Sequence, residues 1–128
     1  VPSPIEEQLK LSPFINQIML DGANRPHNVA LIVVDEETLS DWLKSEGIAR
    51  EGALKNPKVI KQYEDEIKRF GNSLKSYELP KAIALIDEEF TPENDMLTPS
   101  LKVKRRIVLN NYGDLIEGLY QEGDAAAE

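Results

Sequence analysis

An uninterrupted apolar run, VALIVV at Val29–Val34, constrains the fold more than any other stretch of the 128-residue chain. Its residues do not alternate between apolar and polar, so a strand formed by them would have no face suited to water. We therefore expect a strand that is covered on both faces or central in a small sheet. The run is far shorter than the roughly 20 residues that span a bilayer, so it does not predict a transmembrane helix.

Two other stretches predict strands that accompany this one. Residues 14–20 are rich in apolar and β-tolerant side chains and lead into Asp21-Gly22, a turn signal, so they should pair with the apolar run. The intervening Asn24-Arg25-Pro26 is expected to belong to the turn. A third buried strand, AIALI at Ala82–Ile86, follows Pro80.

Helical periodicity fills much of the remaining sequence. The opening segment predicts a short helix ended by Pro13, and the residues after Asp35 predict an amphipathic helix that stops near Gly47. A cap and a first-turn proline, Asn56-Pro57, begin a longer helix, which we expect to pack on its own sheet rather than form a coiled coil. Its predicted apolar stripe comprises Ile60, Tyr63, Ile67, Phe70, Leu74 and Tyr77. We expect a last helix with four residues on one face, Leu115, Ile116, Leu119 and Tyr120.

This order of elements predicts an α+β fold with a small three-stranded sheet and helices packed on it in a single domain. We place the domain at residues 1–121. Residues 122–128 are small and charged and predict a disordered tail.

The composition excludes several kinds of chemistry. The chain has no cysteine and one histidine, His27, which we interpret as a surface turn residue, so we predict neither a nucleophilic triad nor a metal site. Acidic groups at Asp35-Glu36-Glu37 and Asp87-Glu88-Glu89 lie at element ends and are interpreted as solvated capping residues. A formal net charge of -8 argues against nucleic-acid binding.

The basic stretch LTPSLKVKRRIVL, residues 97–109, contrasts with this acidity. It contains Lys102, Lys104, Arg105 and Arg106, four of the 15 basic residues of the chain. Thr98-Pro99-Ser100 predicts an exposed turn, so Lys102 should lie on a projecting segment that Val103 and Ile107 anchor to the core. From composition alone the stretch is either a charged loop that screens an acidic surface or a local anion site.

Five motifs in fixed order carry a resemblance to a known family. They are PIE at 4–6, FINQIMLDG at 14–22, NRP at 24–26 with VALIV at 29–33, FTPENDMLTP at 90–99 and LKVKRR at 101–106. Together they resemble the C-terminal domain of a long-chain fatty acid CoA ligase, in the adenylate-forming (AMP-binding) superfamily. The pattern F-T-x-E-N-x-x-L-T-P-(S/T)-x-K-x-K-R and the helical insert between Asp35 and Pro80 are typical of the long-chain class.

The resemblance implies a two-step ligase with fatty acid, ATP, Mg²⁺ and coenzyme A. Lys102 matches the catalytic lysine of acyl-adenylate formation, although Leu101 stands where the wider superfamily has glycine, which leaves Lys104 as an alternative. Lys104, Arg105 and Arg106 are expected to contact coenzyme A phosphates or the large domain, or to be plain surface charge. The family's C-terminal domain rotates between the two steps as a mobile lid.

The same resemblance implies that the partner is an N-terminal adenylation domain of the same polypeptide. That domain carries the ATP loop, the fatty-acid tunnel and most contacts to ATP and Mg²⁺, so we expect an excised domain that binds no cofactor and is inactive alone. We expect a cytoplasmic location, with peripheral membrane association left open. The alternative is a free-standing partner-binding or regulatory module that uses the long amphipathic helix and the basic loop.

Overall fold

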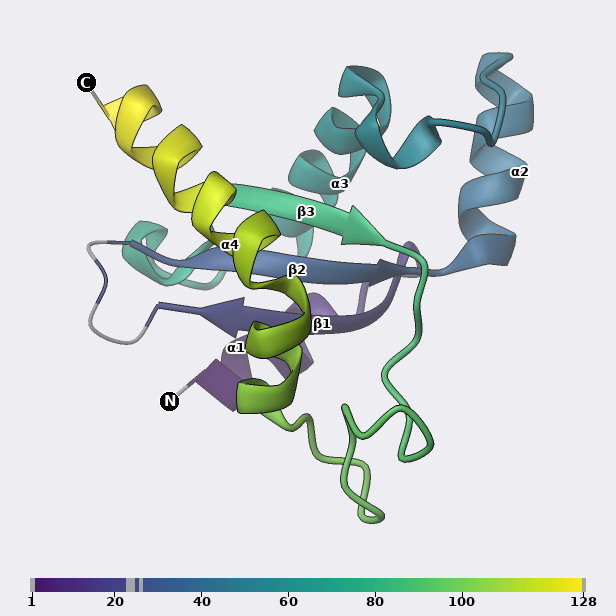
Figure 1. The fold of residues 1–128 in the computed structure, drawn as a ribbon. Coiled ribbons are helices and arrows are strands. Elements are labelled where there is room, and N and C mark those ends of the chain that lie inside the picture. Colours follow the sequence, from purple (N-terminus) through teal and green to yellow (C-terminus); the bar gives the residue numbers. More distant parts are fainter. Residues whose placement is uncertain (1, 23–24, 26, 128) are drawn as a thin grey trace.

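A computed structural model describes residues 2–22, 25 and 27–127 and contains a three-stranded sheet in the order β1-β2-β3 (Figure 1). The strands are β1 (Ile15–Asp21), β2 (Val29–Val34) and β3 (Ala82–Ile86). β1 and β2 pair antiparallel, and β2 and β3 pair parallel. The predicted α+β fold is confirmed, whereas Asn24 and Pro26 of the predicted turn lie outside the described residues.

The central position of β2 explains why its sequence does not alternate. Ala30, Ile32 and Val34 point into one core, and the intervening Val29, Leu31 and Val33 point into a second core on the other side of the sheet. All six residues are buried. The expectation of a strand covered on both faces is therefore confirmed.

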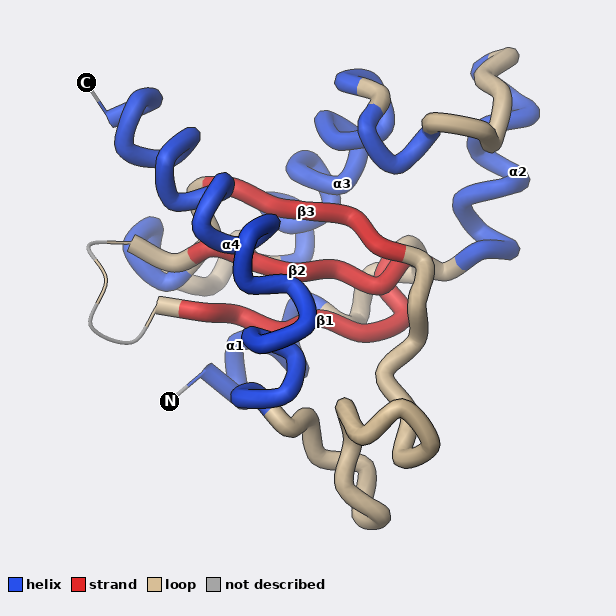
Figure 2. The backbone as a smooth tube through the Cα atoms, in the orientation of Figure 1, coloured by secondary structure: helices blue, strands red, loops and turns tan. Residues whose placement is uncertain are grey.

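The first core lies beneath α1 (Pro2–Leu9), α2 (Glu36–Glu46), the short 3-10 helix η1 (Ala53–Lys55) and α3 (Pro57–Phe70) (Figure 2). The ends of α2 follow the predicted signals. The Asp35 side chain accepts a hydrogen bond from the Thr38 N–H at 3.1 Å, and Gly47 ends the helix with a left-handed φ of 69°. The Asn56 side chain caps α3 by accepting from the Lys58 N–H at 2.9 Å.

Helix α3 is shorter than the predicted stripe. It ends at Phe70, and a Cβ at the following Gly71 would lie 2.7 Å from the Ile67 carbonyl oxygen and 2.6 Å from Leu79 Cδ2, so a residue with a side chain would not fit here without a shift. Tyr77, predicted to extend the stripe, lies in the 3-10 helix η2 (Ser76–Glu78) and is 70% exposed. The predicted helix is therefore too long, and the stripe is wrong for Tyr77, whereas Leu74 packs against the first core as predicted although it lies beyond α3.

Helix α4 (Arg105–Ala127) covers the second face of the sheet (Figure 1). It begins within the basic stretch, earlier than predicted, and its backbone leaves helical geometry at Tyr112 (φ -120°, ψ 21°). Past this kink Ile116, Leu119 and Tyr120 are buried as predicted, whereas Leu115 is 38% exposed, so its inward placement is wrong.

The bounds of α4 include residues 122–127, which the sequence predicts to be a disordered tail. That disorder, like the domain limit at residue 121, stays a prediction. Within the described residues, no helix combines the length and apolar character that crossing a membrane requires.

Candidate functional site

The long connection from β3 to α4 runs past one end of the sheet and carries the first part of the basic stretch (Figure 2). Asn94 stabilises the first half of this connection through three hydrogen bonds. The Asn94 Oδ1 accepts from the Thr91 N–H at 3.0 Å and the Met96 N–H at 3.1 Å, and its Nδ2 donates to the Glu89 carbonyl at 2.8 Å. Phe90 and Met96 anchor this segment in the second core at 1% and 0% exposure.

Gln17 fastens the same connection to β1. Its Nε2 donates to the Phe90 carbonyl at 3.0 Å, and its Oε1 accepts from the Phe90 N–H at 2.6 Å. The pairing of β1 with β2 shifts register between Ile15 and Gln17, an irregularity of the kind that re-aims a side chain. This role of Gln17 was not predicted from the sequence, although a polar residue among the apolar residues of a predicted strand was an available signal.

A tight hairpin presents Lys102. Leu97 and Val103 form an antiparallel bridge; the Thr98 N–H donates to the Lys102 carbonyl at 2.8 Å, and the Lys102 N–H donates to Thr98 Oγ1 at 3.0 Å. Val103 and Ile107 pack against the second core, which confirms their predicted role as anchors. The backbone of Lys102 is therefore fixed, while its side chain is exposed.

Leu101 adopts an unusual backbone conformation in this hairpin. Its φ is 68°, in the left-handed region that glycine occupies without the steric cost of a Cβ. This geometry gives a physical reason for the glycine expected here in the wider superfamily. The Leu101 side chain is 70% exposed.

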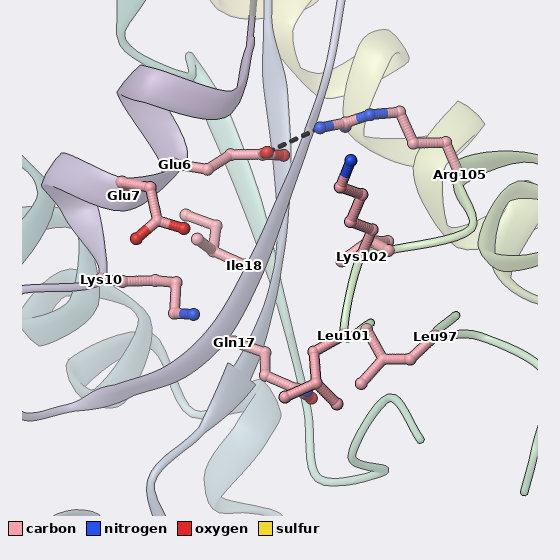
Figure 3. A pocket seen from close by; sticks show the side chains of 10 residues that line it. Glu6, Glu7, Lys10, Gln17, Ile18, Leu97, Leu101, Lys102 and Arg105 are labelled. Atoms are coloured by element: carbon pink, nitrogen blue, oxygen red, sulfur yellow. Dashed lines mark hydrogen bonds and ion pairs between the residues drawn. The ribbon is translucent and has the colours of Figure 1, made fainter. Parts of the chain in front are cut away.

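An open pocket of about 350 Å³ lies beside the hairpin. Figure 3 shows the side chain of Lys102 directed toward the pair formed by Glu6 and Arg105, with Lys10 on the α1 side. The lining residues come from α1, β1, the hairpin and the start of α4, and are Glu6, Glu7, Lys10, Gln17, Ile18, Leu97, Leu101, Lys102, Val103 and Arg105.

Arg105 joins three elements through a hydrogen-bonded network. Its Nη2 lies 2.6 Å from Glu6 Oε1 on α1, and its Nη1 donates to the Leu20 carbonyl on β1 at 2.8 Å. The Leu20 N–H donates to Glu6 Oε2 at 2.7 Å, and Glu6 is only 7% exposed. The buried carboxylate was not predicted, although Glu6 lies three residues before the inward-facing Leu9 and so shares its helix face.

The other cations of the basic stretch differ in their surroundings. Lys104 Nζ forms an ion pair with the Asp95 carboxylate, and Arg106 is exposed in the first turn of α4. No ion pair among the described residues involves Lys102. The structure thus brings Lys102 and Arg105 to one pocket and directs Lys104 to Asp95.

A separate cluster fastens the β1–β2 connection to α4. The Tyr120 hydroxyl lies 2.6 Å from Asp21 Oδ2, and burial, together with this carboxylate, raises the pKa of Tyr120. The Arg25 guanidinium stacks 4.1 Å from the ring centroid of Tyr120 and pairs with Glu117. His27, predicted to be a surface turn residue, is half-buried with its ring centroid 5.4 Å from that of Tyr120.

The predicted acidic groups have structural roles. Besides the Asp35 cap, Arg50 Nη2 lies 2.6 Å from Glu36 Oε1 and 3.2 Å from Asp87 Oδ2, which links the start of α2 to the end of β3. These carboxylates raise the pKa of the Arg50 guanidinium, chiefly through the Glu36 hydrogen bond. The described residues contain no group of three or more acidic, histidine or cysteine side chains placed to hold a metal ion.

Comparison with known proteins agrees with this architecture. Long chain acyl-CoA synthetase 7, peroxisomal, of Arabidopsis thaliana is 35% identical over an alignment of 127 positions, which covers 94% of this chain and 18% of that protein. Long-chain-fatty-acid–CoA ligase 1 of Homo sapiens is 32% identical over 93% of this chain and 18% of its own length. The chain thus spans about a fifth of the curated relatives that it matches.

Among solved structures, the A-PCP didomain of carboxylic acid reductase from Segniliparus rugosus in complex with AMP matches with a TM-score of 0.78 and 26% identity. That match covers 95% of this chain and 16% of the reductase chain. Residues 1–124 match the family model described as the AMP-binding enzyme C-terminal domain. The chain therefore belongs to the C-terminal domain family of AMP-binding, adenylate-forming enzymes.

Proposed function

We propose that the chain is the mobile C-terminal domain of an ATP-dependent long-chain fatty acid CoA ligase, with Lys102 as its catalytic lysine. The observation that carries this proposal is the contrast between Lys102 and its neighbours. Lys102 extends from a braced hairpin, whereas Lys104 is paired with Asp95 and Arg105 with Glu6. This contrast favours Lys102 over Lys104 as the lysine that serves a second domain.

The chemistry suits a lysine at this place. In the first step a fatty acid carboxylate attacks the α-phosphate of ATP, which gives an acyl-adenylate and pyrophosphate; in the second, the coenzyme A thiol displaces AMP. Negative charge gathers where the carboxylate meets the phosphate, and an ammonium group there both positions the reactants and stabilises the transition state. ATP and Mg²⁺ would be bound mainly by the large adenylation domain.

A rigid hairpin on a small domain also suits a lid. The N-terminal adenylation domain, the proposed partner in the same polypeptide, would receive Lys102 for the first step and a different face of the lid for the second. Arg106 is exposed and available for contact with coenzyme A phosphates or that domain, whereas Lys104 and Arg105 would first have to leave Asp95 and Glu6. Alone, the chain should produce no acyl-CoA.

No observation favours the alternative of a free-standing partner-binding module. That alternative needs an exposed apolar face on the long amphipathic helix. In the structure Val59, Tyr63 and Ile67 of α3 are buried in the first core of the same domain. A cytoplasmic location stays a prediction, because the similar Arabidopsis synthetase is named as peroxisomal.

The test is Lys102→Ala in the longer ligase, with the half-reactions measured separately. Acyl-adenylate formation should fall roughly 10²- to 10³-fold, by analogy with loss of an oxyanion donor. Thioester formation from supplied acyl-adenylate should persist. Lys104→Ala is the matched control and should retain most of the adenylation activity. Equal loss of both half-reactions in Lys102→Ala, or loss of adenylation in Lys104→Ala alone, would contradict the assignment.

A further inference from the structure

Leu101 combines two features that are unfavourable in the domain by itself. Its φ of 68° places the backbone where a Cβ approaches the carbonyl oxygen, and its apolar side chain is 70% exposed. The Leu101 N–H donates to the Thr98 carbonyl at 2.9 Å, so the hairpin imposes this conformation. Backbone strain of this kind is a recognised mark of functional positions.

Asp95 provides an internal comparison. It is the other non-glycine residue of the described chain with a positive φ, at 66°. Aspartate tolerates the left-handed region better than leucine, and the Asp95 carboxylate pairs with Lys104. Its conformation therefore has a local explanation, whereas the Leu101 side chain is neither polar nor packed into either core.

The place of Leu101 in the hairpin indicates where its side chain is used. It lines the same pocket as Lys102 and belongs to the same hydrogen-bonded turn, so the two residues move as one unit. If Lys102 enters the active site of a large domain, Leu101 arrives with it and its exposed surface is removed from water. That step converts an unfavourable exposed leucine into favourable apolar burial.

We propose that Leu101 is a positioning residue that packs against an apolar surface of the large adenylation domain when Lys102 is delivered for the first step. This inference rests on the proposed function. The apolar contact favours the closed arrangement used for adenylation and holds the hairpin while the ammonium of Lys102 stabilises the reacting groups. Because the lid presents another face for the thioester step, the contact is absent there.

The experiment compares three substitutions at Leu101 in the longer ligase. Leu101→Gly and Leu101→Asn both suit a positive φ but remove the apolar side chain, whereas Leu101→Met keeps an apolar side chain of similar size. The glycine and asparagine variants should lower kcat/KM for acyl-adenylate formation about tenfold or more, as expected for loss of a buried leucine contact. The methionine variant should stay within about threefold of the parent.

Two further readouts exclude a general folding effect. Thioester formation from supplied acyl-adenylate should be unchanged in all three variants. The thermal midpoint of the 128-residue chain should be unchanged or higher with Leu101→Gly, because glycine relieves the strain. Tyr77→Ala is the matched control, since Tyr77 is equally exposed at 70% but lies outside the pocket lining, and it should leave both half-reactions unchanged.

Three results would overturn the inference. Parent-like adenylation in both the glycine and asparagine variants would show that the side chain is not used. A loss confined to long-chain and absent with medium-chain fatty acids would assign Leu101 to the acyl chain instead of the large domain. Equal losses in both half-reactions with a lower thermal midpoint would assign it to folding. If Lys102→Ala forms acyl-adenylate at the rate of the parent, the proposed function itself is wrong. If Lys102→Ala loses this activity but the Leu101 variants keep it, only the inference about Leu101 is wrong.

Discussion

Replacement of Arg105 by alanine tests whether the hydrogen-bonded network of Arg105, Glu6 and Leu20 stabilises the fold. The change removes the ion pair with Glu6 and the hydrogen bond to the Leu20 carbonyl, and so separates α4 from α1 and β1. Glu6 then keeps the Leu20 N–H as a partner but loses its countercharge. The side chain of Glu6 is 9% exposed, so water replaces the lost guanidinium poorly.

The expected cost follows from this burial. Breaking a fully buried ion pair by removing one partner costs about 3–5 kcal/mol. The Arg105 side chain is 36% exposed, so solvent already screens part of the interaction, and we expect about 2–3 kcal/mol. For a domain of this size that corresponds to a fall in thermal midpoint of about 6–15 °C.

Thermal unfolding followed by circular dichroism measures the effect, with Arg106→Ala as the control. Arg106 is the next residue on α4 and carries the same charge, but it is exposed, so its replacement should change the free energy of unfolding by less than about 0.5 kcal/mol. A double-mutant cycle with Glu6→Ala should give a coupling energy of about 1–2 kcal/mol. If Arg105→Ala costs no more than Arg106→Ala, the network does not stabilise the fold as argued.

Two further predictions concern the connection before α4 and three tyrosines. Asn94→Ala should destabilise the chain by about 1–3 kcal/mol and speed amide exchange at Met96, because the Thr91 N–H and the Met96 N–H lose the acceptor that they share. Asn94→Asp keeps an acceptor at this position and should restore most of the lost stability. Unchanged amide exchange at Met96 in Asn94→Ala would contradict this role of Asn94. Burial raises the pKa of Tyr63, Tyr112 and Tyr120 above the unfolded value of about 10, so their contribution to stability is complete below about pH 10 and is lost as the pH rises above it. Urea unfolding across this range should show the fall, Tyr63→Phe should reduce it, and a flat profile would refute it.

The sequence predicted those parts of the fold that local chemistry determines. VALIVV was predicted to be a strand covered on both faces or central in a small sheet, and its two sets of side chains do enter two cores. The limits of α2 followed from Asp35 and Gly47, and the start of α3 from Asn56-Pro57, because each of these residues acts on backbone groups within a few positions.

The failures lie where distant parts of the chain decide the outcome. The apolar spacing through Leu74 and Tyr77 predicted that α3 continues past Phe70, where it ends; Leu74 still packs against the first core, but Tyr77 is 70% exposed in η2. Similarly, four residues beyond the kink at Tyr112 were predicted to face inward, yet Leu115 is 38% exposed while Ile116, Leu119 and Tyr120 are buried. Periodicity describes an uninterrupted helix and carries no information about the packing that interrupts it.

In the candidate site, too, the sequence predicted what local residues determine but not what distant residues determine. The pattern K-x-K-R placed three cations within four positions, and nothing in their spacing distinguished Lys102 from Lys104. What distinguishes them is the location of the carboxylates: Asp95 reaches Lys104, and Glu6, 99 residues from Arg105 in sequence, reaches that arginine from α1. Carboxylates of the same domain thus pair with Lys104 and Arg105, whereas no ion pair among the described residues involves Lys102. Under the proposed function, the exposed ammonium group of Lys102 would meet the negative charge that develops on the reacting groups in the large domain.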